Sequence, residues 1–308
     1  MDQTTFWKNF RLGTELDIAG RFIYNGLRQL REMENLAVEE EVFEFLYSLS
    51  VGIERLLKVA VVLIEHDPSA DQEEFEKSLI THDHLGLLYR VRKSGRTVNL
   101  AGPHSELLQL LAGFYKTYRY GRFSQASAEI HAQEKGPLHK YVERHLKIVI
   151  QEDPLFSRDE KMPRLRKFIG SKVGKIAEVL YELICEEAGR LGTYTHELRS
   201  NSKAEKIFGR KQFDFSTEDA IWREVLVFIA NSQTTTGHIG YVKRMKPLDL
   251  DPGLIVDYLQ CFSSEPKKLE VMDEIEALYG ELEKPGDREK AIHVIGDPAV
   301  HFKDEDEE

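Results

Sequence analysis

Apolar residues recur at spacings of three and four along most of the chain, the pattern of amphipathic α-helices. The clearest stretch is residues 39–65, where apolar positions from Val42 to Ile64 follow this period and surround the last turns nearly completely. The sequence therefore predicts an all-α protein, a multi-helix bundle of about ten helices. Helices are expected at 15–36, 39–65, 71–79, 83–92, 103–118, 137–150, 171–187, 218–231, 252–262 and 266–282.

Breaks in this pattern divide the chain into segments. Glycine and proline are sparse, at 21 and 10 residues, which favours long helices over many short strands. The polar stretch 151–162 is the clearest interruption, and the chain ends in five consecutive acidic residues. We therefore expect a helical bundle over residues 1–152, a second helical unit with a basic segment over 153–262, and a peripheral helix with an acidic tail over 263–308.

Charge is distributed unevenly along the chain. The formal net charge is −11, yet residues 161–211, here called the basic window, hold twelve Lys/Arg and six Glu and are net +6. The overall acidity argues against broad electrostatic binding of nucleic acid. The basic window is nevertheless the stretch best suited to facing an anion.

Cysteine usage and hydropathy indicate the compartment. Cys185 and Cys261 lie in apolar helical patterns without metal or redox spacing, so free thiols in a reducing cytoplasm are expected. The N-terminus lacks the apolar region of a signal peptide. The longest apolar run, Val59–Ile64, is too short to span a bilayer, and no membrane partner is expected.

Standard catalytic signatures are missing from the sequence. It contains no GxxxxGK[ST] phosphate loop, no GxGxxG, no HExxH, no CxxC and no GxSxG. An ordinary nucleotide hydrolase, zinc protease or serine hydrolase is therefore unsupported, and neither a cofactor nor a bound metal is predicted.

Arg190 and His196 form the most suggestive pair of the basic window. An arginine presents a fork of donors that fits a phosphate, and a histidine titrates near neutrality and can move a proton. Together they could bind a phosphodiester and activate a ribose 2′-hydroxyl without a metal. The expected phosphate-binding residues around them are Lys172, Lys175, Tyr194, Arg199 and Lys203.

On a continuous helix, Arg190 and His196 would not face the same site. A separation of six residues places two side chains about 120° apart, so a shared site needs a bend, which Gly192 could supply, or a second copy of the chain. The alternative is that Arg190 caps a helix C-terminus and His196 is an ordinary packing or surface residue.

Two further clusters admit a functional and a structural interpretation. In Thr81-His-Asp-His-Leu85, the histidines could ligate a metal with His66, but Asp83 or Thr81 is equally a good N-cap for the following helix. In the stretch 115–123, tyrosines interleaved with Arg119 and Arg122 could stack on and clamp a nucleotide. The structural interpretation of that stretch is a helix end whose aromatic residues belong to the core and whose arginines are solvated.

Three short segments in the N-terminal half resemble a known family. They are Gly52-Ile-Glu-Arg-Leu-Leu-Lys58, Thr81-His-Asp-His-Leu-Gly-Leu-Leu88 and Tyr118-Arg-Tyr-Gly121. In order, they resemble the second helix, the turn into the third helix, and the start of the last helix of HEPN domains. The resemblance covers roughly residues 15–125.

This resemblance implies a four- or five-helix bundle, often dimeric, that binds RNA. Many HEPN proteins are metal-independent ribonucleases of defence or toxin–antitoxin systems, with an Arg-x4–6-His motif. Arg190 and His196 have this spacing, although Leu191 replaces the usual polar residue and the pair lies outside the HEPN-like region. The resemblance thus implies Arg190 as the phosphate-binding residue and His196 as the acid/base.

Two hypotheses about function follow. The first is a HEPN-like protein that binds RNA or a nucleotide and cleaves RNA, acting as a homodimer. The second is a non-enzymatic helical interaction or regulatory protein, in which the basic window pairs with the acidic tail or with an acidic protein partner.

Overall fold

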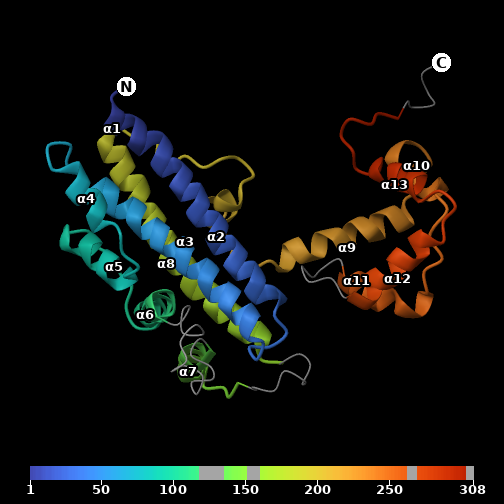
Figure 1. The fold of residues 1–308 in the computed structure, drawn as a ribbon, viewed down its shortest axis with the longest axis horizontal. Helices are drawn as coiled ribbons and strands as arrows, with labels where there is room; N and C mark the ends of the chain where they lie inside the picture. Colours follow the sequence, from blue (N-terminus) through green and yellow to red (C-terminus); the bar gives the residue numbers. More distant parts are fainter. Residues whose placement is uncertain (118–134, 151–159, 262–268, 303–308) are drawn as a thin grey trace. The chain divides into compact units, whose positions relative to one another are not determined.

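The computed structural model describes residues 1–117, 135–150, 160–261 and 269–302. Within them all regular secondary structure is helical, and no strand is present. The predicted all-α bundle is confirmed (Figure 1). The helices are α1 Gln3–Phe6, α2 Leu12–Glu32, α3 Glu39–Glu65, α4 Gln72–Ser78, α5 His84–Lys93, α6 Pro103–Lys116, α7 Lys135–Leu146, α8 Met162–Leu191, α9 Ser216–Asn231, α10 Gly237–Arg244, α11 Ile255–Cys261, α12 Leu269–Gly280 and α13 Pro285–His293.

The chain forms two compact units, Met1–Phe215 and Ser216–Glu308. This division differs from the predicted boundaries at 152/153 and 262/263, because α8 packs against α3 and belongs to the core of the first unit. Charge follows the division. The first unit holds 32 Lys/Arg and 32 Asp/Glu, whereas the second holds 10 and 21, so the second unit carries the whole net charge of −11.

The first unit is organised around α3. Helices α2, α3 and α8 run nearly aligned (Figure 1), and α2 and α3 form the most extensive helix pair of the protein. The predicted all-round apolar character of the last turns of α3 matches their burial, because the five consecutive residues 59–63 are each at most 2% exposed. Helix α3 is therefore the central core helix of the first unit.

Close contact between α2 and α3 depends on glycine. A Cβ atom added to Gly52 would lie 2.9 Å from the backbone nitrogen of Ile23 and 3.0 Å from the carbonyl oxygen of Ala19. These distances are shorter than a carbon atom tolerates, so only glycine allows the two backbones to approach this closely.

The ends of several helices follow local signals. The side chain of Asp83 caps α5 and Pro103 begins α6. Helix α8 ends at Gly192, whose φ of +63° is the left-handed conformation that glycine favours. The predicted helix 171–187 is longer in the structure, because Pro163 lies in its first turn, where a proline needs no backbone donor.

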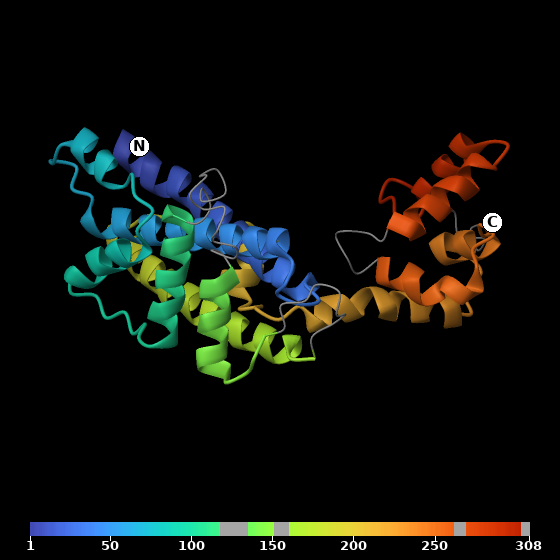
Figure 2. The ribbon, with the colours of Figure 1, turned by 60° about the horizontal axis from the view of Figure 1, so that its bottom comes forward.

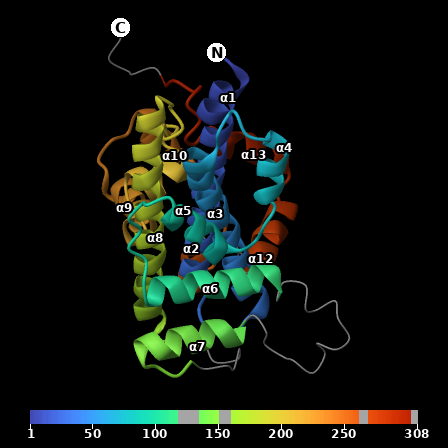
Figure 3. The same cartoon turned by 90° about the vertical axis from the view of Figure 1, so that its left-hand side faces the viewer.

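Helices α6 and α7 lie side by side and cross the direction of α3 and α8 (Figures 2 and 3). Helix α6 packs against both α3 and α8, whereas α7 packs mainly against α6. As a result, α7 forms an outer layer of the first unit, and the groove between α6 and α7 opens to solvent.

The second unit contains α9 to α13 and has a small core. Tyr258, Cys261 and Val271 are its buried apolar residues, with Met272 and Ile275 packed against them. Among the residues of this unit that the structure describes, no other helix packs extensively against α9. Many apolar side chains of α9 therefore remain exposed.

Candidate functional site

The guanidinium of Arg190 is held by a buried carboxylate on its own helix. Its Nε donates to Oε2 of Glu187 over 2.8 Å, and Nη2 of Arg96, from the loop after α5, lies 2.5 Å from the other carboxylate oxygen. Glu187 is only 3% exposed, whereas the side chain of Arg190 is 55% exposed. Arg190 thus neutralises a buried acid and keeps part of its guanidinium in solvent.

Lys8 lies near this ion-pair cluster. It is buried, and its Nζ donates over 3.4 Å to the carbonyl oxygen of His66, the C-cap of α3. Burial, with a contribution from the charge of Arg190, lowers the pKa of Lys8. Because Lys8 and Arg190 both lie at helix C-termini, where the helix dipole favours cations, this arrangement fits the structural interpretation of Arg190 as a C-terminal cap.

The segment after Gly192 turns the chain back and carries His196 away from Arg190. The backbone N–H of Tyr194 donates to Oδ1 of Asn9 over 2.7 Å, and the carbonyl oxygen of His196 accepts from the Tyr181 hydroxyl over 2.9 Å. Tyr181 precedes Arg190 by nine residues, which is about 13 Å along the helix. Among the described residues, no hydrogen bond or ion pair joins Arg190 to His196.

The imidazole of His196 is half-buried. Its Nδ1 is shielded from solvent and has no hydrogen-bond partner within the described part of the chain. Arg190 is engaged by Glu187 and the backbone of His196 by Tyr181, so the two predicted site residues have separate partners in this structure. The predicted pairing through a second copy stays a prediction.

The other predicted anion-binding residues are mostly engaged with acids, amides or rings. Lys175 pairs with Glu178 over 3.2 Å, Lys203 donates to Asn25 over 2.7 Å, and Lys172 lies 5.4 Å from the ring centre of Phe168. Of these three lysines, Lys175 is the one that pairs with a glutamate of α8, whereas Lys203 is engaged by an amide and Lys172 by a ring.

Tyr194 and Arg199 are the exceptions in this region. Tyr194 is 62% exposed, and Arg199 is exposed with no side-chain partner among the residues that the structure describes. Arg119 and Arg122, which were predicted to clamp a nucleotide, lie outside the described residues.

The histidines of the segment 81–85 make hydrogen bonds within the folded chain. Asp83 accepts the N–H of Gly86 over 3.1 Å, which lowers the pKa of its carboxyl and confirms the N-cap interpretation. His84 is fully buried with Nε2 at 2.9 Å from the Ser50 carbonyl oxygen, and burial lowers its pKa. His66 bonds to Gln72 instead, and the described ranges contain no cluster suited to a metal.

His82 belongs to an ion-pair network that sequence reasoning missed. The buried carboxylate of Glu54 binds Nδ1 of His82 at 2.9 Å and Nζ of Lys58 at 2.7 Å. The ring of His82 contacts Tyr115 edge to face, with centroids 4.5 Å apart. The i, i+4 spacing of Glu54 and Lys58 indicates their pairing, but the contact with His82 depends on how α5 follows α3.

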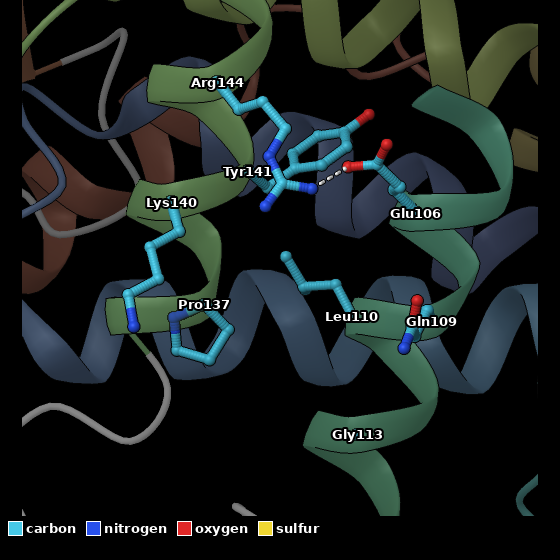
Figure 4. A pocket seen from close by; sticks show the side chains of 8 residues that line it. All are labelled: Glu106, Gln109, Leu110, Gly113, Pro137, Lys140, Tyr141 and Arg144. Atoms are coloured by element: carbon cyan, nitrogen blue, oxygen red, sulfur yellow. Dashed lines mark hydrogen bonds and ion pairs between the residues drawn. The ribbon is translucent and has the colours of Figure 1, made fainter. Parts of the chain in front are cut away.

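A pocket of about 310 Å³ lies between α6 and α7 (Figure 4). Helix α7 contributes Lys140 and Arg144, and α6 contributes Glu106 and Leu110. Nη1 of Arg144 donates to Oε2 of Glu106 over 2.9 Å. No sequence motif indicated this pocket, because it exists only where α6 and the next helix, α7, lie side by side.

Helix α9 presents the largest run of exposed apolar side chains. At 100° per residue, six of its apolar residues fall within an arc of about 160°, here called the α9 stripe. Exposure is 60% for Phe228, 56% for Ile221 and 48% for Val225. The α9 stripe consists of Ile221, Trp222, Val225, Leu226, Phe228 and Ile229.

Comparison with protein-family models, curated proteins and solved structures finds no match for this chain. The class that the fold defines is a multi-helix, all-α protein of two units. Within the described residues, no helix is both long and apolar enough to cross a membrane.

Proposed function

We propose that this chain is a non-enzymatic interaction protein of the cytoplasm that binds a basic amphipathic helix of a partner protein through the α9 stripe. The observation that carries this proposal is an apolar helix face left uncovered by its own unit. Contiguous exposed apolar surface of this kind marks protein interaction sites.

The low stability expected of an unpacked α9 favours the presence of a partner that covers its apolar face. A 16-residue helix is marginal in water on its own, and most helices gain their stability by packing an apolar face against a neighbour. Without extensive packing inside its unit, α9 lacks that gain. A partner that covers Ile221, Val225 and Phe228 supplies it.

Charge specifies the kind of partner. The unit around α9 holds 21 Asp/Glu and 10 Lys/Arg, so a second acidic copy of it would be repelled. A helix with apolar residues on one face and lysines or arginines at its edges complements both the stripe and its acidic surroundings. The free thiols of Cys185 and Cys261 agree with a reducing compartment.

The test uses two valines of α9 that differ in which side of the helix they occupy. Val225 lies in the stripe, whereas Val227, itself 57% exposed, lies on the opposite side. A designed Leu/Lys amphipathic peptide is titrated into the full-length chain by fluorescence anisotropy. Val225→Asp should weaken binding at least about tenfold, because it places a charge in the apolar contact. Val227→Asp should change binding less than about twofold.

A Leu/Gln peptide of the same pattern is the control for charge and should bind more weakly than the Leu/Lys peptide at low salt. Equal effects of the two aspartate variants would refute the stripe as the binding surface. A dimer in sedimentation that Val225→Asp dissociates would assign the stripe to a second copy of the chain instead.

A second proposal, an RNA-binding ribonuclease, rests on the exposed side chains of Tyr194 and Arg199 near the half-buried His196. An exposed tyrosine can stack on a base, and an unpaired arginine can bind a phosphate. If His196 is the acid/base, His196→Ala should slow cleavage of a fluorescent single-stranded RNA at least about a hundredfold. Equal rates for the two proteins, or no cleavage by either, would remove this catalytic role.

A further inference from the structure

The pocket between α6 and α7 has the size and lining of a small-molecule site. Its volume of about 310 Å³ is at the lower end of the range for ligand pockets. All the side chains that line it belong to described residues of the first unit, so the site is independent of the α9 stripe.

One wall of the pocket is cationic. Lys140 and Arg144 are four residues apart on α7, which places them on the same side of the helix (Figure 4). Lys140 is exposed and has no hydrogen-bond or ion-pair partner among the described residues. Arg144 uses Nη1 to bind Glu106, which leaves its other N–H groups available to a ligand.

The single carboxylate of the lining is already neutralised. Oε2 of Glu106 accepts from Arg144 and lies 3.1 Å from Nε2 of His145. Although desolvation opposes them, these two bonds lower the pKa of Glu106, so the carboxylate is ionised at neutral pH and paired. The charge of Lys140 therefore remains uncompensated, and the pocket suits a ligand with one negative charge.

The rest of the lining is mainly apolar, with Gln109 as a neutral polar side chain at its edge. The side chain of Leu110 extends into the space between the two helices, and Pro137 lies beside Lys140 (Figure 4). The hydroxyl of Tyr141 donates to the carbonyl oxygen of Pro103 over 2.9 Å, which anchors its ring against the pocket. A ligand here contacts carbon on one side and cations on the other.

We propose that this pocket binds a small organic monocarboxylate with an aromatic or branched apolar body. The carboxylate lies between Lys140 and Arg144, where charge-assisted hydrogen bonds hold it. The apolar body packs on Leu110, Pro137 and the ring of Tyr141.

The experiment titrates 3-phenylpropionate into the full-length chain and follows saturable binding by calorimetry or by NMR. The neutral analogue 3-phenylpropanol and the small anion acetate should each bind at least about tenfold more weakly, because each lacks one of the two contacts. Lys140→Met keeps the length of the side chain and removes its charge, and should raise the dissociation constant about tenfold.

The matched control is Lys93→Met, which removes an exposed charge of the same unit outside the pocket and should leave binding unchanged. A second variant, Leu110→Asn, should weaken 3-phenylpropionate and leave the weak binding of acetate in place. No saturable binding of 3-phenylpropionate, or equal effects of the two lysine substitutions, would overturn the proposal. Binding as strong for acetate as for 3-phenylpropionate would overturn the apolar part of the site.

Discussion

Replacing Glu187 by alanine should lower the free energy of unfolding of the first unit by about 2–3 kcal/mol. The carboxylate is buried and bridges Arg96 and Arg190, so its removal leaves two neighbouring guanidinium groups without their common counter-charge. The expected loss is below the about 3–5 kcal/mol of a fully buried broken pair, because Arg190 can turn to solvent. Urea unfolding followed by circular dichroism measures it.

Glu186→Ala is the control for this prediction. Glu186 precedes Glu187 on α8, but its side chain is exposed, so its loss should change stability by less than about 0.5 kcal/mol. Similar unfolding midpoints for the two variants would show that the ion pairs of Glu187 contribute little to the fold. A double variant that also removes Arg190 should recover part of the loss, since it removes an unpaired charge.

Replacing Gly52 by alanine should destabilise the first unit by about 1–3 kcal/mol. The added methyl group meets backbone atoms of α2, at 2.9 Å from the nitrogen of Ile23 and 3.0 Å from the oxygen of Ala19. Backbone atoms move only if the helices separate, so the α2–α3 interface must loosen. The change is measured as a lower midpoint of thermal or urea unfolding.

Gly189→Ala provides a control of opposite sign. A Cβ atom at Gly189 meets no atom within 4 Å, and the residue lies inside the helical span of α8. Alanine there should raise stability by about 0.5–1 kcal/mol through helix propensity alone. If both glycine variants shifted stability in the same direction, the close approach at Gly52 would not be the limiting contact.

Local signals identified most helices of the first unit. The period of apolar residues located α2, α3 and α6, and cap residues such as Asp83 and Pro103 marked where helices begin. The predicted boundary at 152/153 differs from the division into compact units after Phe215, because the polar interruption before α8 does not show that α8 returns to pack on α3. Interruptions in a pattern reveal loops, and packing between distant helices decides which of them separate units.

The candidate sites also separate into features that the sequence predicted and features that depend on the tertiary structure. The spacing of Arg190 and His196 was visible in the sequence, and so was the i, i+3 spacing of Arg190 and Glu187. The second partner of Glu187, Arg96, comes from a loop almost a hundred residues earlier, and only the fold brings it there. Likewise, His82 stood out in the sequence, whereas its carboxylate partner Glu54 lies on another helix. Ion pairs between segments that are distant in the chain produce no regular spacing in the sequence. Residue spacing alone therefore could not distinguish a catalytic pair from a structural one.

By itself, the sequence determined that this protein is helical, where most core positions lie and that its charge is unevenly distributed, because helix periodicity and composition are local properties. The tertiary structure alone decided that α8 completes the first unit, that several cations of the basic window are engaged by other side chains, and that apolar residues of α9 remain exposed. It also created the pocket between α6 and α7. These features arise from the way the helices cross and pack against one another, which the local periodicity of the sequence does not specify.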